Sequence, residues 1–403
     1  MSEDLFNFHF ADLGGLAKQF DRRFSIYDDE RDLDMFGGVQ ELMEEVSRQC
    51  TELLQNRGRD ETIFVRLAAA SSVNGCCFRT DCGTYLIAVN AGVIYRLRLI
   101  MFILMEVDCG NREAFNKEDR EWIYNIFGYR LDDAERSLRK IDDPKIQEKL
   151  LEEASNRIKD RSNICKNDSF IGDFLAFLAL DFAMLHEIQH AALGHLEKSY
   201  PLRSLYSRLW ESGCSISERS EELQGIEYAA DFAAGVFAGR GFAARDSGFR
   251  LSGFVGSDDI WCRGLSFSVK VALSLISFSV SLLDARHQES DHPHPELRFL
   301  IYFRGVSIGV QELDTMVNSK WRNGISEGYW AVTNAFQHLM IHEPIMWSIT
   351  SNMQAWYEKF HLSIEVEQML KRANSQLDKS MKESRPFWLP ILLGGPRSNP
   401  NQD

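Results

Sequence analysis

The longest regular pattern of apolar positions lies in residues 171–197. A four-residue repeat in this stretch is carried by Phe174, Leu178, Phe182, His186 and His190. A spacing of four keeps side chains on one slowly drifting face of a helix. Asn167, Asp168 and Ser169 offer capping side chains before the stretch, and Gly194 lies near its end. We therefore expect one long helix here.

Helical patterns also occur elsewhere along the chain. Residues 40–57 combine helical spacing with many charges, and residues 91–107 are helical in pattern and strongly apolar. Further helices are predicted over residues 221–238, over residues 265–284, from about Glu296 after Pro293 and Pro295, and through about Glu383 in the C-terminal part.

Strand patterns are confined to one short region. Residues 62–67 and 85–89 are rich in β-branched and apolar side chains. Turn residues lie between them, at Asn74-Gly75 and at Asp81-Cys82-Gly83. The predicted fold class is α+β, a mainly α-helical core with a small antiparallel sheet.

Composition narrows the choice of partners. Hydrophobic residues make up 44% of the 403 residues and charged residues 26%, which are globular proportions. The formal net charge is −14, from 45 basic and 59 acidic residues. An acidic surface repels phosphate, so we expect no nucleic-acid partner.

The cysteines and the lack of a membrane-spanning pattern predict the cellular compartment. The eight cysteines are scattered without a CxxC pair, which indicates reduced thiols and a cytoplasmic protein. Cys76, Cys77 and Cys82 cluster, but no second cluster completes a metal site. The apolar run 271–283 has only 13 residues, four of them serine, so no membrane insertion is expected. The first residues also lack a signal-peptide pattern.

The strongest chemical pattern is His186-Glu187-Ile188-Gln189-His190. On a helix, two imidazoles four residues apart project about 40° from one another and can reach one tetrahedral zinc ion. Glu187 beside the first histidine could take a proton from water and later donate one to a leaving amine. With ten histidines in the chain, chance would produce this pattern with a probability on the order of 0.02. The apolar flanks place both imidazoles in a buried setting, where a metal would satisfy them.

A third ligand is expected on the predicted helix 221–238. Glu227 lies 37 residues after His190, and Asp231 shares its helix face. We expect Glu227 to bind zinc and Asp231 to accept the second N–H of a ligand histidine. Nearby alanines would let the two helices approach closely.

Other residues could take the third ligand position. Asp231 is one rival, and Glu221 and Glu222 are weaker ones that suit an exposed helix start. His195 is another, but it follows His190 by five residues, whereas metzincins place their third histidine at six. We therefore expect His195 to end the helix or to contact a ligand histidine.

A second histidine cluster lies at Asp291-His292-Pro293-His294-Pro295, before Glu296 and Arg298. Two His-Pro pairs make a rigid corner that leads into a helix. His292 or His294 could donate a hydrogen bond to a developing oxyanion, and Arg298 could orient a carboxylate or the substrate backbone. His338 and His342 are also four apart, but no glutamate follows His338, so we expect them to be surface or structural residues.

Together these motifs resemble those of gluzincin metallopeptidases. The order of HExxH, then Glu227-x-x-x-Asp231, then His292-Pro293 to Arg298 is similar to the HtpX-type and CAAX-processing peptidases. Gly194-His195 also resembles the soluble Lit-type phage-exclusion and ImmA/IrrE-like peptidases. The resemblance implies His186, His190 and Glu227 as zinc ligands, Glu187 as the base, and Asp231 as a partner of a ligand histidine. It also implies a role for His292 or His294 together with Arg298.

The resemblance implies a zincin-like catalytic domain over residues 61–305, and the charged helical pattern at about 110–168 indicates an insertion within it. Residues 1–60 would form an N-terminal helical region, and residues 306–403 a C-terminal helical region with a loose tail. In zincins an edge strand binds extended substrate, and residues 84–89 are the candidate edge here.

The expected function is that of a zinc-dependent endopeptidase acting on a protein or peptide. A dedicated protease, triggered in stress or phage defence, would share this site. The alternative is a non-catalytic helical scaffold or regulatory protein with a structural metal. The sequence does not indicate the oligomeric state.

Overall fold

The computed structural model describes the chain in segments. They are residues 37–55, 60–68, 75–79, 83–90, single positions between 93 and 104, 166–195, 217–243, 258–284, 293, 295–311, 323–333 and 364–383. Most of the predicted charged insertion and the C-terminal tail lie outside these segments, as do His292, His294, His338 and His342.

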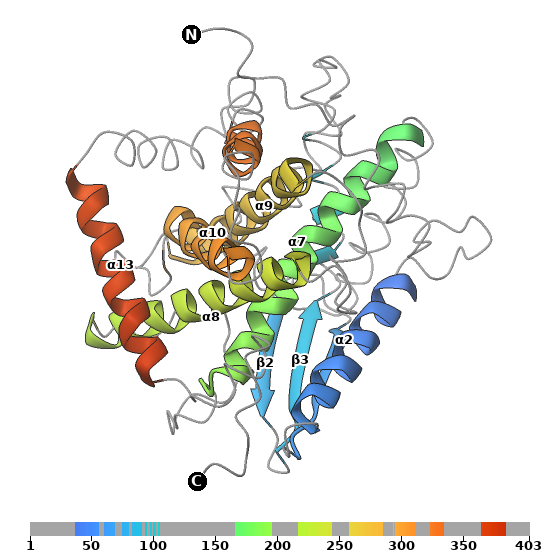
Figure 1. Cartoon of the computed structure of the whole chain (residues 1–403), viewed down its shortest axis with the longest axis horizontal. Coiled ribbons are helices and arrows are strands. Elements are labelled where there is room, and N and C mark those ends of the chain that lie inside the picture. Colours follow the sequence, from blue (N-terminus) through green and yellow to red (C-terminus); the bar gives the residue numbers. More distant parts are fainter. Residues whose placement is uncertain are drawn as a thin grey trace, which may run out of the picture.

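Long helices dominate the described part of the chain, as expected (Figure 1). They are α2 (Gly37–Gln55), α7 (Lys166–Ala192), α8 (Ser217–Ala243), α9 (Asp258–Asp284), α10 (Pro295–Gln311) and α13 (Ile364–Glu383), with a shorter helix at residues 323–333. Among these helices, none is long and apolar enough to cross a lipid bilayer.

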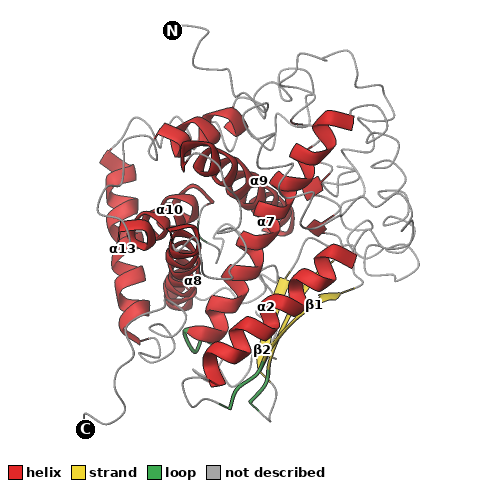
Figure 2. Ribbon diagram, turned by 45° about the vertical axis from the view of Figure 1, so that its right-hand side comes forward, coloured by secondary structure: helices red, strands yellow, loops and turns green. Residues whose placement is uncertain are grey.

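Helix α7 is the central element of the fold. Figure 2 shows it between the sheet with α2 on one side and the helices α8 and α10 on the other. Of residues 171–195 only Ala183 is not buried, so the whole surface of the helix is covered. The helix begins at Lys166, and the expected capping residues 167–169 therefore lie inside its first turn.

The sheet is mixed rather than antiparallel. It has three strands in the order β1-β3-β2, namely β1 (Ile63–Ala68), β3 (Tyr85–Asn90) and β2 (Gly75–Arg79). β2 runs antiparallel to β3, but β1 and β3 are parallel. The chain reverses direction twice and β3 enters between the other two strands, which makes β1 and β3 parallel. The prediction of an antiparallel sheet is wrong for that pair. Strand β2, which lies between the two turn sequences, was not predicted.

This strand order also overturns residues 84–89 as an edge, because β3 is the central strand. The outer edge of β1 is covered by α2 through two hydroxyl groups one helical turn apart. The N–H of Val65 donates to Ser47 Oγ at 2.7 Å, and the N–H of Ile63 donates to Thr51 Oγ1 at 3.1 Å. Strand β2 contacts α7. On its outer side, away from β3, β2 pairs with no strand in the described part of the chain.

Helices α8 and α10 pack at backbone contact along two pairs of glycines, Gly235 with Gly239 and Gly305 with Gly309. A Cβ atom added at Gly235 would lie 2.0 Å from the carbonyl oxygen of Tyr302, and one at Gly305 would lie 2.1 Å from that of Phe232. No side chain fits in such a space. The crossing fixes how the two helices are aligned.

A shared apolar cluster joins α13 to α7, α8 and α10. It consists of Leu193, Tyr228, Ala229, Ala233, Leu297, Ile301, Ala373 and Leu377. All eight side chains are at most 4% exposed. Their burial holds the end of α7, the middle of α8 and the start of α10 as one unit.

Candidate metal centre

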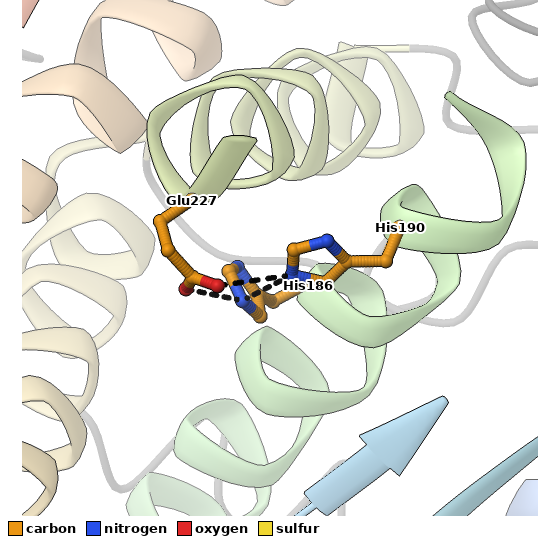
Figure 3. A group of neighbouring side chains, drawn as sticks. All are labelled: His186, His190 and Glu227. Carbon is orange, nitrogen blue, oxygen red and sulfur yellow. Dashed lines mark hydrogen bonds and ion pairs between the residues drawn. The ribbon is translucent and has the colours of Figure 1, made fainter. Parts of the chain in front are cut away.

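Two imidazoles from α7 and one carboxylate from α8 meet in a buried cage (Figure 3). The Nε2 atoms of His186 and His190 are 3.0 Å apart. The Glu227 carboxylate lies 3.2 Å from His186 Nε2 through Oε2 and 3.6 Å from His190 Nε2 through Oε1. The exposed fractions of the three residues are 2%, 2% and 8%. The predicted spacing therefore brings these residues together.

The cage has the dimensions and donor atoms of a divalent metal site. Zinc bonds of about 2.0–2.1 Å in a tetrahedron place neighbouring ligand atoms roughly 3.3 Å apart, close to the three distances found. His186 Nδ1 lies 2.9 Å from the Asp231 carboxylate and therefore carries a proton, which makes Nε2 the nitrogen that can bind a metal once the ring is neutral. Nε2 faces the Glu227 carboxylate at 3.2 Å, so a cation between them, either a proton or a metal ion, is stabilised. The group could therefore hold a metal ion.

Asp231 lies outside the cage, behind the His186 ring. Its two oxygens accept a bidentate pair of hydrogen bonds from Arg298, Nε to Oδ2 at 2.7 Å and Nη2 to Oδ1 at 2.9 Å. Burial acts to raise the pKa of Asp231, but the Arg298 guanidinium and His186 outweigh it and hold the pKa below its ordinary value. Asp231 thus stays charged although it is 0% exposed.

Asp231 in turn changes the titration of His186. Burial acts to lower the pKa of His186, but the charge and hydrogen bond of Asp231 raise it to about 9. For His190, burial is the largest effect and lowers the pKa to about 4. Burial acts to raise the pKa of Glu227, but the hydrogen bond and charge of His186, together with His190 and Arg298, outweigh it and hold the pKa well below its usual range. One ligand histidine is therefore protonated near neutral pH in the metal-free protein, and the other is neutral.

Glu187 is a buried carboxyl group whose oxygens have no hydrogen-bond partner among the described residues. Glu187 is only 2% exposed. Burial raises its pKa to about 7. A carboxyl group with a pKa near neutrality is well placed to accept and return a proton. The lack of a partner leaves both oxygens available.

His195 reaches His190 because of the way α7 ends. Gly194 has φ of 70°, the left-handed conformation typical of a glycine just past a helix. The N–H of His195 donates to the carbonyl of His190 at 3.1 Å, and the N–H of Gly194 donates to that of Ala191 at 3.1 Å. This Schellman turn brings His195 Nδ1 to 3.0 Å from His190 Nδ1. His195 therefore contacts the side of His190 opposite the cage.

The structure describes some of the remaining site residues expected from the sequence and leaves others outside the described segments. The sequence suggested that Arg298 orients a carboxylate or the substrate backbone, and in the structure it binds the carboxylate of Asp231. Its Nη2 also lies 3.6 Å from Glu227 Oε2. Pro293 is buried, but the structure does not describe His292 and His294 beside it. The side chains of Glu221 and Glu222 are likewise outside the described part, and Cys77 is buried in β2.

The sequence indicated every residue of the cage and its contacts, but not the pairing of Arg298 with Asp231. These two residues are 67 positions apart, and no local pattern joins them. Comparisons with protein-family models, with curated proteins and with solved structures found no match for this chain.

Proposed function

We propose that the chain is a zinc-dependent peptidase. The observation that carries the proposal is the convergence of His186, His190 and Glu227, with Glu187 next to His186 in the chain as a buried carboxyl group that has no hydrogen-bond partner among the described residues. Two imidazoles and one glutamate are a ligand set used by catalytic zinc, which keeps a further position for water or substrate. The separations of 3.0, 3.2 and 3.6 Å suit that ion.

Bound zinc would supply Lewis acidity, polarising the scissile carbonyl group and lowering the pKa of water. Glu187 would take a proton from the attacking water on a carboxylate oxygen and pass it to the nitrogen of the leaving amine. The water oxygen bonds to the carbonyl carbon as the C–N bond breaks. One amide and one water thus give a carboxylic acid and an amine, which at neutral pH are a carboxylate and an ammonium ion.

Other residues of the chain would support these steps. Asp231 would hold the His186 ring through Nδ1, and Arg298 would hold Asp231. The proposal includes a hydrogen bond from His292 or His294 to the carbonyl oxygen as negative charge develops on it.

The proposed substrate is a protein or peptide bound in extended form. Extended segments bind by adding a strand to an open sheet edge. β1 has its edge covered by α2, whereas β2 lies beside α7 and is unpaired on its outer side among the described strands. β2 therefore replaces residues 84–89 as the proposed substrate strand.

The proposal also includes a dedicated protease, triggered in stress or phage defence, in place of a general one. Cleavage of casein and cleavage of candidate cellular proteins are measured side by side, which separates a general from a dedicated protease. General cleavage of casein without a trigger would remove the dedicated role.

Glu187→Gln tests the enzymatic proposal. The amide cannot take up the proton, so we expect normal zinc stoichiometry and cleavage reduced by at least about 100-fold, within the range lost with a general base. Glu44→Gln, on the exposed face of α2, is the matched control and should cleave normally. Cleavage by the Glu187→Gln variant at the wild-type rate would rule out Glu187 as the base. A wild-type protein that binds zinc but cleaves nothing, with its cellular function unchanged by Glu187→Gln, would mean that the metal is structural and the chain a scaffold or regulator.

A further inference from the structure

Lys270 is a charged side chain in the buried part of α9. It is 1% exposed, and its neighbours along the helix, Val269, Val271, Ala272 and Leu273, are buried and apolar. Burial lowers the pKa of Lys270 to about 7. A buried lysine is rare and needs a partner.

The partner is Glu296, in the first turn of α10. The two side chains form a buried ion pair, and Lys270 Nζ also lies 4.7 Å from the centre of the Tyr329 ring. Glu296 is 7% exposed, and its charge also suits the N-terminus of a helix. The contact therefore joins α9 and helix 323–333 to the start of α10.

Glu296 and Arg298 are two residues apart on α10, so their side chains point about 200° apart around the helix axis. Glu296 contacts Lys270 of α9, and Arg298 contacts Asp231 of α8. The first turn of α10 is thus held from both sides. A rotation of the helix that broke one contact would displace the other.

Stability alone does not account for this pair. A buried ion pair is often matched or exceeded in stability by apolar side chains of similar size, because removing two charges from water costs so much. Apolar side chains can pack together in several orientations of the two helices. An ion pair fixes the orientation of the helix that carries it.

We propose that Lys270 and Glu296 are a positioning pair for the metal centre. They set the rotation of α10, which holds Arg298 on Asp231 and, through Asp231, the His186 ring in the cage. This inference rests on the proposed metal function. The ion pair itself includes none of the proposed metal ligands.

The test is the double variant Lys270→Met with Glu296→Gln, which removes both charges together and leaves neither one buried alone. Zn²⁺ affinity is measured by competition with a chelator, and the Co²⁺ absorption spectrum reports ligand geometry. We expect Zn²⁺ affinity to fall about tenfold, at the lower end of the range for residues that orient ligands. The Co²⁺ bands should shift.

Two further variants separate positioning from packing. Arg263→Met with Glu327→Gln removes another ion pair of α9, 2.8 Å long, that joins helix 323–333 and not α10. It should leave affinity and spectrum unchanged. Lys270→Arg with Glu296→Asp keeps both charges and about the same combined length, and should restore wild-type affinity.

Unchanged affinity and spectrum in Lys270→Met with Glu296→Gln would overturn the inference while leaving the metal proposal intact. Equal losses in the Arg263 control, or no recovery in the Arg–Asp variant, would also overturn it. A wild-type protein without Zn²⁺ affinity would overturn both proposals. If the Met–Gln variant does not fold, Glu296→Gln alone replaces it with the same expected and contrary results, since Lys270 can lose its proton.

Discussion

Asp231 and Arg298 form a bidentate ion pair in which the carboxylate is 0% and the arginine 2% exposed. The same carboxylate contacts His186 Nδ1 at 2.9 Å. One acidic group therefore both neutralises a buried guanidinium and orients a cage histidine. These two duties can be separated by substitution.

Asp231→Asn should weaken both the fold and the metal site. It leaves Arg298 without its bidentate partner and with only the Glu227 carboxylate, 3.6 Å away, as a counterion, which costs up to about 3–5 kcal/mol of unfolding free energy. Zinc affinity should fall about 10–100-fold, because His186 loses its anionic partner. Chemical denaturation and zinc titration measure the two effects, with Asp378→Asn on the exposed face of α13 as control.

Adding Arg298→Met to Asp231→Asn removes both charges. We expect most of the stability to return, because no unpaired charge stays buried. Zinc affinity should remain low, because His186 still lacks a carboxylate. Recovery of both properties together would show that Asp231 acts only as the counterion of Arg298.

Metal binding should release about one proton near pH 7. The pKa of His186 is raised to about 9, above its ordinary value of 6.5, so the ring is protonated at pH 7 and must lose that proton to bind a metal. Zinc affinity should therefore rise with pH up to about 9. Calorimetry in buffers of different ionisation enthalpy counts the protons, and a count of zero at pH 7 would contradict the assignment.

The same pKa predicts the opposite trend for the metal-free fold. A histidine whose folded pKa exceeds the unfolded value stabilises the protein fully below about pH 6.5, and this contribution is lost as pH rises through about 9. Denaturation of the metal-free protein should show that decline across this window. With saturating zinc the decline should be smaller or reversed.

His195 should act on the metal through His190. His195→Asn keeps a hydrogen-bond acceptor near the position of Nδ1, whereas His195→Leu removes it. We expect near wild-type zinc affinity for the asparagine variant and a loss of about 10–100-fold for the leucine variant. Equal affinities would mean that the 3.0 Å contact with His190 has no part in metal binding.

Gly235→Ala should separate α8 from α10. The added methyl group would lie 2.0 Å from the carbonyl oxygen of Tyr302, and neither backbone can yield without shifting a helix. A loss of about 3 kcal/mol is expected, at the upper end for overpacking. Gly225→Ala in the same helix, with its nearest contact at 3.0 Å, should cost less. Thermal unfolding compares the two.

The local parts of the candidate site could be predicted from the sequence. Helical periodicity alone places His186 and His190 on one face of α7, since a spacing of four is a property of the helix. Gly194 ends that helix because the left-handed turn favours glycine, and the turn then carries His195 back to His190. Glu227 and Asp231 share a face of α8 for the same reason as the histidines.

Relations between distant segments could not be predicted in this way. Helical spacing says which residues share a face, but not which way that face points. The pairing of Arg298 with Asp231 and that of Lys270 with Glu296 required the helices to be packed. The order of the strands was misjudged because β-pairing depends on long-range contacts, so a central strand and an edge strand can have the same apolar pattern.

The sequence by itself determined the helices, the ligand spacing on α7 and the turn that ends it, because each depends on residues within one or two helical turns. The tertiary structure alone decided that Glu227 faces the two histidines at 3.2 and 3.6 Å. It also decided that α2 closes one edge of the sheet and that α10 is held between two buried ion pairs. Those features depend on how apolar faces pack across the core, where the partners lie tens of residues apart along the chain.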